Sequence, residues 1–265
     1  MDTQLPTKRS VALIAVLAVA SVSFLAIGIK AADDKKHAAK SDAAAVDFKD
    51  KGEPLFNGTD LTGWRFADPG KAKIWSVVPV QLDPADKNKL AAVAETAAKP
   101  AGAMLRAHGD GTDIFTEKAF GDVQLHIEFM IPDGSNSGVY LMGQYEVQIL
   151  SNFGKPDNKL GPGDCGGIYT IKAPDANPLK PYGEWNSYDI VFHAPRFDAA
   201  GKKTENARFV QVAFNGKVIH ENVEAPHPTG GQLPGGEKAK GPLMLQGNHG
   251  SVAFRNIRIT ELEAK

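Results

Sequence analysis

The sequence has little of what marks several large classes of protein. It contains one cysteine, Cys165, among 265 residues, so it can form neither an intrachain disulfide nor a zinc site built from several cysteines. Basic residues do not outnumber acidic ones, at 30 against 31, which leaves no excess positive charge to neutralise nucleic-acid phosphates. We therefore expect no nucleic-acid partner.

Motifs for metal and nucleotide chemistry are also missing. The sequence has no HExxH motif, and it has no GxSxG, Walker or dinucleotide-binding motif. We therefore predict no metal site and no cofactor, and leave open a calcium ion that braces a loop. Cys165 is expected to be a small packed residue, because no partner base can be named for it. Nothing in the sequence indicates an oligomeric state.

The N-terminal segment has the pattern of an export signal. Lys8 and Arg9 precede an uncharged run over residues 10–29, and small residues follow. The run is long for a cleaved signal peptide and just long enough to span a bilayer. We expect residues 1–31 to be either a cleaved signal peptide or a membrane anchor that acts through residues 10–29. Both alternatives place the rest of the chain outside the cytoplasm, as a periplasmic, secreted or membrane-held protein.

The rest of the chain indicates a linker and one all-β domain. Residues 32–50 are predicted to be a solvated linker, and residues 51–265 the domain. A second Ala-rich stretch, residues 89–103, is expected to be a helical excursion or a surface loop. From residue 51 on, short apolar or alternating runs are separated by Gly, Pro, Asn and Asp, and no long amphipathic helix appears. This pattern predicts a two-sheet antiparallel sandwich.

The clearest predicted strand covers Asp122–Ile131. Its odd-numbered residues from Val123 to Ile131 are apolar and should face the core, while His126 and Glu128 point the other way. Asn215-Gly216 separates two further runs and is a strong signal for a two-residue hairpin. The other predicted strands are Ile74–Val80, Ala103–Ala107, Gly138–Met142, Tyr145–Leu150, Gly167–Ile171, Trp185–His193, Ala207–Phe214, Val218–Glu221, Pro242–Gln246 and Val252–Leu262.

Polar residues inside these strands are the candidates for function. Glu146 and Gln148 share one face of their strand, as His126 and Glu128 do in theirs. Two carboxylates on strand faces can flank a glycosidic bond as acid and base. The alternative is that both are solvent-facing charges on an exposed sheet.

Other candidates lie in turns and loops. Asn136 follows a Pro-Asp-Gly turn, and its amide can hold a sugar hydroxyl or simply belong to the turn. His249 lies between two glycines in a predicted loop, where histidine is often functional. Most Trp and Tyr residues should be core, but Tyr169 and Trp185 lie beside Gly-rich turns, where a ring can reach a ligand.

Four segments resemble the 3-keto-disaccharide hydrolase domain family. They are EPLFNGTDLTGW at 53–64, the stretch from TDIF to YEVQIL at 112–150, the stretch from CGGIY to APRFD at 165–198, and GPLMLQGNHGSVAFRNIRI at 241–259. They follow the family's order and span most of residues 53–262. The resemblance implies a concanavalin A-like jelly roll, in agreement with the strand pattern.

The resemblance also implies cleavage of glycosides whose sugar carries a ketone at C3. A base removes the acidified C2 proton, the glycosidic oxygen leaves, and water then adds. The implied catalytic candidates are Glu128, Glu146 and His249. The residues expected to bind the substrate are Asn136, Tyr140, Gln148, Tyr169, Trp185, Gln246 and Arg255.

Two classes of function follow from these residues. The first is an exported hydrolase that cleaves 3-keto-glycosides by acid–base chemistry. The second is a non-catalytic carbohydrate-binding or cell-surface module, since a sandwich fold does not by itself determine function. The two carboxylates and His249 favour the enzyme, because a binding module needs only aromatic and amide side chains. A carbohydrate is the expected partner in both cases.

Overall fold

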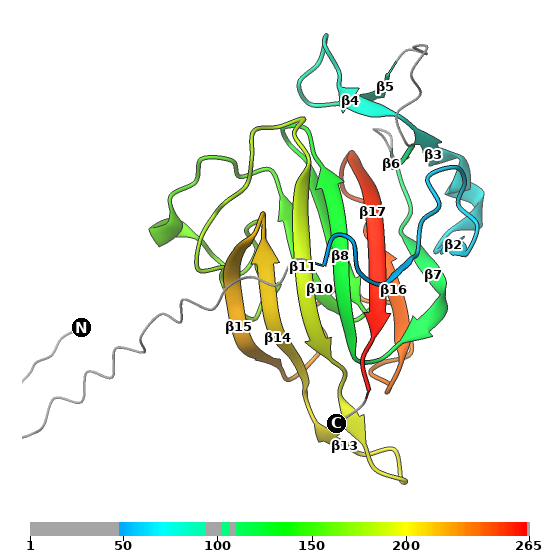
Figure 1. The fold of residues 1–265 in the computed structure, drawn as a ribbon, viewed down its shortest axis with the longest axis vertical. Coiled ribbons are helices and arrows are strands. Elements are labelled where there is room, and N and C mark those ends of the chain that lie inside the picture. The colour runs from blue at the N-terminus through cyan, green and yellow to red at the C-terminus, as the bar shows by residue number, and fades with distance from the viewer. Residues whose placement is uncertain (1–47, 94–101, 107–109, 264–265) are drawn as a thin grey trace, which may run out of the picture. The chain divides into compact units, whose positions relative to one another are not determined.

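Two antiparallel sheets pack face to face in this protein (Figure 1). The computed structural model describes residues 48–93, 102–106 and 110–263. Within them the secondary structure is almost entirely strand, with two short 3-10 helices, η1 (Pro69–Ile74) and η2 (Asp157–Lys159). The predicted all-β, two-sheet antiparallel jelly-roll sandwich is confirmed.

The larger sheet has eight strands in the order β15-β14-β11-β8-β17-β6-β3, with β1 also paired to β17. Every pairing in it is antiparallel. The strands are β1 (Glu53–Pro54), β3 (Trp75–Val78), β6 (Ala103–Arg106), β8 (Val123–Met130), β11 (Asn186–His193), β14 (Ala207–Phe214), β15 (Lys217–Ala225) and β17 (Val252–Glu261).

The smaller sheet has five strands in the order β10-β9-β16-β7-β2. Two small hairpins, β4-β5 and β12-β13, lie outside both sheets. These strands are β2 (Trp64–Phe66), β4 (Val80–Leu82), β5 (Leu90–Ala92), β7 (Ile114–Phe120), β9 (Asn136–Leu141), β10 (Tyr145–Leu150), β12 (Arg196–Phe197), β13 (Lys203–Glu205) and β16 (Gly241–Leu245).

Alternation along the strands places the core between the two sheets. Leu125, Ile127 and Phe129 of β8 are fully buried there, as predicted, and they meet Val147 and Ile149 of β10 in one hydrophobic cluster. Asn215-Gly216 forms the predicted hairpin turn between β14 and β15, and both residues have positive φ, at 49° and 77°. Residues at even positions of β8 and β10 consequently point to the outer faces of the two sheets.

One prediction about strands was wrong. Residues 167–171 form no strand, only isolated bridges of Ile168 to Val147 and Lys172. Thr170 has a positive φ of 62°, which turns the chain back after one paired residue. Strand β7, in contrast, was not predicted, because the exposed Glu117, Lys118 and Ala119 interrupt the apolar alternation.

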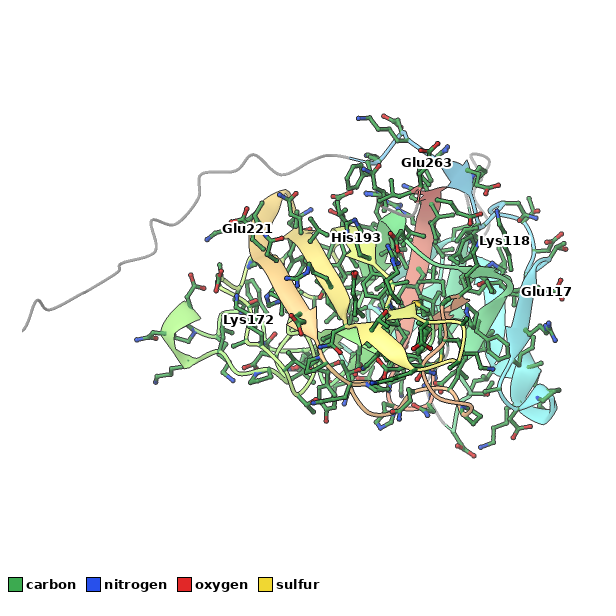
Figure 2. All side chains as sticks on the ribbon, turned by 90° about the horizontal axis from the view of Figure 1, so that it is seen from below. Glu117, Lys118, Lys172, His193, Glu221 and Glu263 are labelled. Carbon is green, nitrogen blue, oxygen red and sulfur yellow. The ribbon has the colours of Figure 1, made fainter. Side chains whose placement is uncertain are left out.

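The outside of the sandwich carries the charged side chains, including Glu117 and Lys118 of β7 (Figure 2). The Lys118 ammonium lies 2.7 Å from Glu53 and 3.0 Å from Glu261, and so it links β7 of the smaller sheet to β1 and β17 of the larger one. Such exposed ion pairs contribute little to stability, because water screens them. The free energy of folding must come mainly from the apolar interior.

The described domain begins within the predicted linker. Phe48 is 3% exposed, and its backbone N–H donates to Asp189 Oδ1 over 3.3 Å, so the last residues of the predicted linker pack on the domain. Residues 1–31 lie outside the described residues, and the export signal or anchor stays a prediction. Most of the Ala-rich stretch, residues 94–101, also lies outside them. No helix in the described part of the chain is long and apolar enough to cross a membrane.

Candidate functional site

A row of side chains crosses the outer face of the five-stranded sheet. In the strand register Arg65 lies opposite Phe115, Phe115 opposite Met244, Met244 opposite Tyr140, and Tyr140 opposite Glu146. Directly opposed residues of antiparallel strands point to the same side of the sheet. Tyr140, Met244 and Glu146 are each almost completely buried, so neighbouring loops cover this face.

Glu146 lies in the middle of a polar cluster on that face. Its carboxyl group accepts a hydrogen bond from the Tyr140 hydroxyl, and the Tyr140 oxygen accepts one from Gln246 Nε2 over 3.3 Å. Its backbone N–H donates to Thr229 Oγ1 over 2.9 Å, which attaches the 226–240 loop above it. The fold therefore brings together three predicted site residues, Tyr140, Glu146 and Gln246.

The surroundings of Glu146 make its carboxyl group an unusually strong base. Burial raises the pKa of Glu146 to about 8, because the ionised form is poorly solvated. The Tyr140 hydrogen bond lowers this pKa, but burial outweighs it, and the nearby Asp113 raises the pKa further. Burial and the Glu146 carboxyl also raise the pKa of Tyr140 far above its ordinary range, so its hydroxyl keeps its proton. A proton acceptor and a proton donor thus touch each other.

Two glycines make room for this pair. A methyl group on Gly138, the neighbour of Gln148 in the strand register, would lie 2.1 Å from Glu146 Oε1. A methyl group on Gly231 would lie 2.7 Å from the Tyr140 hydroxyl, and this glycine also has a positive φ of 65°. Gly138 of β9 is therefore part of the site, because the carboxyl group of Glu146 lies directly over it.

Asp113 is a site residue that the sequence analysis missed. It accepts a hydrogen bond from the Gly247 backbone N–H over 2.9 Å, and burial raises its pKa. The charge of His249 lowers the pKa of Asp113, whereas the charge of Asp113 raises that of Glu146. Asp113 immediately precedes the unpredicted strand β7, and recognition of that strand would have placed it beside β16 and its loop.

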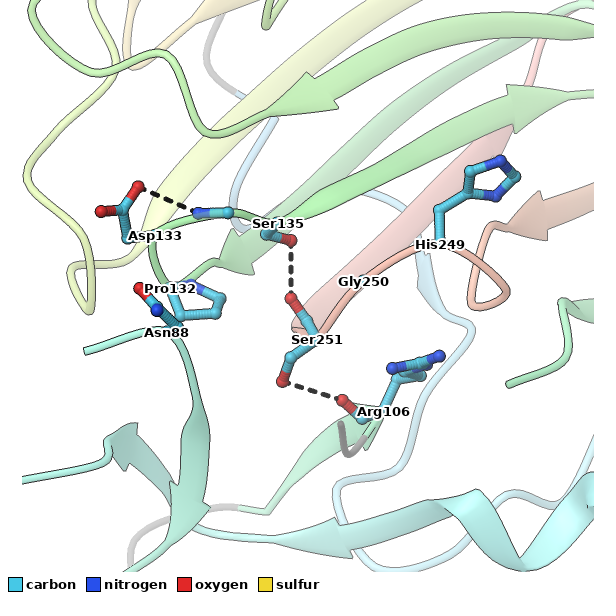
Figure 3. A pocket seen from close by; sticks show the side chains of 9 residues that line it. Asn88, Arg106, Pro132, Asp133, Ser135, His249, Gly250 and Ser251 are labelled. Atoms are coloured by element: carbon cyan, nitrogen blue, oxygen red, sulfur yellow. Dashed lines mark hydrogen bonds between the residues drawn. The ribbon is translucent and has the colours of Figure 1, made fainter. Parts of the chain in front are cut away.

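His249 lies at one border of the cluster. It is exposed, and its Nδ1 contacts the side chain of Asn248. It also lines a pocket of about 680 Å³, in which Asn88, Pro132 and Asp133 form one side and His249 and Arg106 the other (Figure 3). The structure places His249 within electrostatic reach of Asp113 and gives no direct contact between His249 and Glu146.

Three further predicted residues belong to the same region. Gln148 is buried beside Glu146 on the outer face, and its Oε1 accepts a hydrogen bond from the Ile149 backbone N–H over 2.9 Å. Asn136 begins β9 on this same face. Tyr169 donates its backbone N–H to the Glu146 carbonyl oxygen over 3.2 Å, and its side chain lies within electrostatic reach of Tyr140.

Glu128, Trp185 and Arg255 lie elsewhere, and the expectation that Glu128 and Glu146 flank one glycosidic bond as acid and base was wrong. Glu128 is in β8 of the eight-stranded sheet and Glu146 is in β10 of the five-stranded sheet, so their outer faces lie on opposite sides of the sandwich. The alternation within each strand was correct. Long-range pairing decides which sheet a strand joins, and the pattern within one strand does not contain that information.

The Glu128 group is a network of charges on the outer face of the larger sheet. Arg255 Nε donates to Glu128 Oε2 over 2.6 Å, and Asn256 Nδ2 donates to Oε1 over 2.8 Å. The Arg255 guanidinium also lies 3.9 Å from the centre of the Trp185 ring. Burial opposes ionisation of Glu128, but His126, Asn256 and Arg255 together lower its pKa to about 2. A carboxylate held ionised in this way is a poor proton acceptor.

The alternative that both carboxylates are solvent-facing is also wrong, since Glu128 and Glu146 are 6% and 2% exposed. Among the described residues, no group of three or more His, Cys, Asp or Glu side chains is arranged to hold a metal ion. The prediction that no cofactor is needed stays a prediction.

Comparison with known proteins identifies the family. A family model described as a 3-keto-alpha-glucoside-1,2-lyase-like domain matches residues 51–260. A 3-keto-disaccharide hydrolase of Bacteroides thetaiotaomicron is 25% identical over an alignment of 187 positions, with 58% of this chain and 63% of that protein covered. The chain thus matches less than two thirds of that relative's length.

Solved structures agree with the fold. A proposed glycosyl hydrolase of Parabacteroides distasonis, solved at 2.13 Å, has 30% identity and a TM-score of 0.58, with 80% of this chain and 84% of that chain covered. A second such protein of the same organism, solved at 1.70 Å, has 21% identity and a TM-score of 0.51, with 79% and 93% covered, and supports the fold alone. Because the family model covers most of the 265 residues, the chain belongs to the family of 3-keto-alpha-glucoside-1,2-lyase-like domains.

Proposed function

We propose that this carbohydrate-active domain cleaves glycosides whose sugar carries a ketone at C3, and that Glu146 is the general base. One observation carries the proposal: the buried carboxyl group of Glu146 has a pKa of about 8 and touches a hydroxyl that stays protonated. A base with a pKa near the working pH is best suited to remove a weakly acidic proton. The 3-keto-disaccharide hydrolase name of the Bacteroides relative supports this choice of substrate.

The reaction needs no covalent intermediate with the protein. The C3 ketone acidifies the C2–H bond, and the ionised Glu146 takes that proton while the electron pair moves into an enolate. The enolate then expels the glycosidic oxygen from C1. That oxygen takes up a proton, and the leaving group departs as an alcohol. Water adds its hydroxyl to C1 and a proton returns to C2, so the net reaction is hydrolysis.

Tyr140 and Gln246 support this chemistry. In the structure the Tyr140 hydroxyl donates to Glu146. Once Glu146 has taken the C2 proton, that hydrogen bond loses its charged acceptor, and the hydroxyl can donate to the enolate or to the leaving oxygen. Gln246 Nε2 donates to the Tyr140 oxygen and holds the hydroxyl in place. His249, at the border beside Asp113, is a further group that can carry a proton.

The test compares sugar release from a 3-keto-glucoside with release from the unoxidised glucoside. Wild-type protein should cleave only the first. Glu146→Gln should lower kcat by roughly 100- to 10,000-fold, the usual contribution of a positioned acid or base, because the amide keeps the shape and loses the basicity. Glu128→Gln is the matched control, since it removes a buried carboxylate from the opposite sheet and should leave kcat nearly unchanged.

Several outcomes would contradict the proposal. Equal release from both glucosides would mean that the ketone plays no part in the reaction. A folded Glu146→Gln variant with full turnover would remove Glu146 as the base. Binding of both glucosides without any release would identify the domain as a carbohydrate-binding module. Melting temperatures of all variants must be measured alongside, so that lost rate is not confused with lost fold.

A further inference from the structure

We infer that residues 226–240 form a lid that must open before a substrate can reach Glu146, and that Lys203 holds this lid closed. The inference rests on the proposed function, because it concerns access to the same carboxyl group. Glu146 is 2% exposed and Tyr140 is 1% exposed. A base that removes a C2 proton must touch the sugar, and a sugar ring cannot touch groups that are covered so completely. Part of the cover therefore has to move.

The middle of the lid lies directly over the reactive pair. Thr229 is buried, and its Oγ1 accepts the Glu146 backbone N–H over 2.9 Å. A methyl group on Gly231 would lie 2.7 Å from the Tyr140 hydroxyl, so the backbone of the lid passes close to that hydroxyl. Movement of residues 229–231 would therefore uncover both the proton acceptor and the proton donor.

The loop on the other side of the site is fixed in place. The Gly247 N–H donates to Asp113 Oδ1 over 2.9 Å, and the Gly247 carbonyl oxygen accepts from Arg106 Nε. A methyl group on Gly247 would lie 2.4 Å from the Thr112 carbonyl oxygen, which shows how closely this loop packs on its neighbours. The movable part of the cover is therefore the segment 226–240.

One ammonium group fastens the lid near both of its ends. Lys203, in β13 of the β12-β13 hairpin, donates to the Pro226 carbonyl oxygen over 2.7 Å and to Glu237 Oε2 over 2.8 Å. The Tyr145 hydroxyl of β10 donates to the same Glu237 carboxylate. The side chains of Lys203 and Glu237 are 25% and 16% exposed, so water screens their attraction less than that of a surface pair. Loss of the Lys203 ammonium would release both ends at once.

The lid can rearrange at two pairs of glycines. Residues 230–231 and 235–236 are all glycine, and all four have positive φ, a region that other residues rarely adopt. Between the pairs, the Leu233 N–H donates to the Gly143 carbonyl oxygen over 2.8 Å, and the Leu233 carbonyl oxygen accepts from Gln144 Nε2 over 2.9 Å. The segment between the glycine pairs thus rests on the β9–β10 turn through bonds that water can replace.

The closed lid leaves one polar atom unsatisfied. Gln144 Oε1 is buried and has no hydrogen-bond partner among the described residues. A buried acceptor without a donor costs free energy, and water that enters on opening would recover it. The contacts of Lys203 and this unpaired acceptor therefore act in opposite directions. Such a balance suits a lid that opens and closes in each turnover.

A disulfide can lock the lid without changing a residue of the reactive pair. A β-carbon on Gly143 would lie 3.5 Å from Leu233 Cβ, within the usual separation of about 3.5–4.5 Å for a disulfide. The double variant Gly143→Cys/Leu233→Cys should therefore cross-link on oxidation. The one native cysteine, Cys165, is fully buried and does not interfere.

The oxidised double variant should lose at least about 20-fold in kcat/KM for a 3-keto-glucoside, and reduction should restore the rate. Leu233→Cys alone is the matched control. Treated with the same oxidant, it should change by less than about twofold, because it cannot cross-link.

The Glu146 amide hydrogen reports on the lid without any substrate. It is bonded to Thr229, so it exchanges with solvent when that part of the lid moves away. Lys203→Met keeps the length of the side chain and removes the ammonium, and it should speed exchange of this amide by about tenfold or more. Lys202→Met, the exposed neighbour in the same hairpin, is the matched control and should change it by less than about twofold. Amides of β8 should be unchanged in both, which separates lid opening from unfolding.

Each other outcome is decisive. Full turnover by the oxidised double variant overturns the inference, and so does an unchanged exchange rate of the Glu146 amide in Lys203→Met. If the double variant does not fold or does not cross-link, the exchange result for Lys203→Met decides alone.

If the wild-type protein cleaves no 3-keto-glucoside, the proposed function fails by itself, and amide exchange then decides about the lid. Slower exchange of the Glu146 amide in the cross-linked protein and faster exchange in Lys203→Met would still support it. Equal exchange in the wild type and both variants would overturn it.

Discussion

Two glutamates of this chain have similar burial and opposite ionisation behaviour. Glu128 has positive partners in Arg255 and His126, whereas Glu146 has a tyrosine hydroxyl and a nearby aspartate. Partner charges outweigh desolvation in the first case, and desolvation prevails in the second. The result is a pKa of about 2 for Glu128 and about 8 for Glu146. Burial alone would not have distinguished a structural carboxylate from a reactive one.

The raised pKa of Glu146 predicts how activity depends on pH. Turnover by an ionised base should rise with pH up to about 8 and then level off. The measurement is kcat/KM for a 3-keto-glucoside between pH 5 and pH 9. Glu146→Gln should give a low rate without this rise. A wild-type rate that is flat across the range would mean that another group supplies the base.

Stability should change with pH in the opposite direction. The folded protein holds the Glu146 proton more tightly than the unfolded chain, whose ordinary pKa is 4.5. Stability is therefore lost as pH rises from about 4.5 to about 8, by roughly 5 kcal/mol for a shift of this size. Urea unfolding should show this loss in wild type, and Glu146→Gln should lack that part of it.

The sequence revealed the carboxylate but not its environment. Alternation correctly placed Glu146 and Gln148 on one face of their strand, away from the core. The pKa of Glu146 depends on Tyr140 from β9, on Asp113 from the start of β7 and on the 226–240 loop. Those contacts join residues far apart in the chain, and no local pattern contains them.

At the scale of elements, the sequence predicted which face of its strand each side chain occupies. It did not predict which of the two sheets each strand joins. Strands β8 and β10 both alternate cleanly, yet β8 pairs with β11 and β17 while β10 pairs with β9. The family motif residues therefore divide between two outer faces, with Glu146 on one and Glu128 on the other. We assign the Glu128 face to stability, because its charged groups satisfy one another.

The centre of that second face is His126. Its Nδ1 lies 2.7 Å from Asp189 Oδ1, and its Nε2 lies 3.9 Å from Glu128 Oε1, which is a charge contact rather than a hydrogen bond. Burial by itself would lower the pKa of His126, but Asp189 and Glu128 together raise it to about 9. A protonated imidazole thus separates two buried carboxylates at neutral pH.

His126→Asn should destabilise the fold by about 3 kcal/mol at pH 7, because Asp189 and Glu128 would then lack their shared positive charge. The pKa of His126 is raised, so its contribution is fully present below about pH 6.5 and is lost as pH rises through about 9. Urea unfolding of wild type and variant should therefore differ at pH 7 and converge at pH 10. The folded variant should keep kcat; a large loss of turnover would contradict the structural role.

At the scale of the whole molecule, residues 48–55 attach the start of the described chain to the larger sheet. The chain passes over the outer face of the larger sheet, and Figure 1 shows the blue segment in front of β8 and β17. Phe48 bonds to Asp189 of β11, Lys49 lies 3.9 Å from Glu128 of β8, and Leu55 donates its N–H to Ile257 of β17 over 2.8 Å. The sequence did not indicate this packing, because the polar composition of residues 32–46 favoured a linker that extends to residue 50.

This packing predicts that Phe48 stabilises the entire sandwich. Phe48→Ala removes a ring that is 3% exposed and should cost about 3 kcal/mol, the lower end of the range for buried phenylalanine. For a domain of this size that corresponds to a melting temperature lower by about 6–12 °C. Phe153→Ala is the matched control, because its ring is 48% exposed, and it should shift the melting temperature by less than about 2 °C. Equal shifts in the two variants would show that the segment before residue 51 is linker after all.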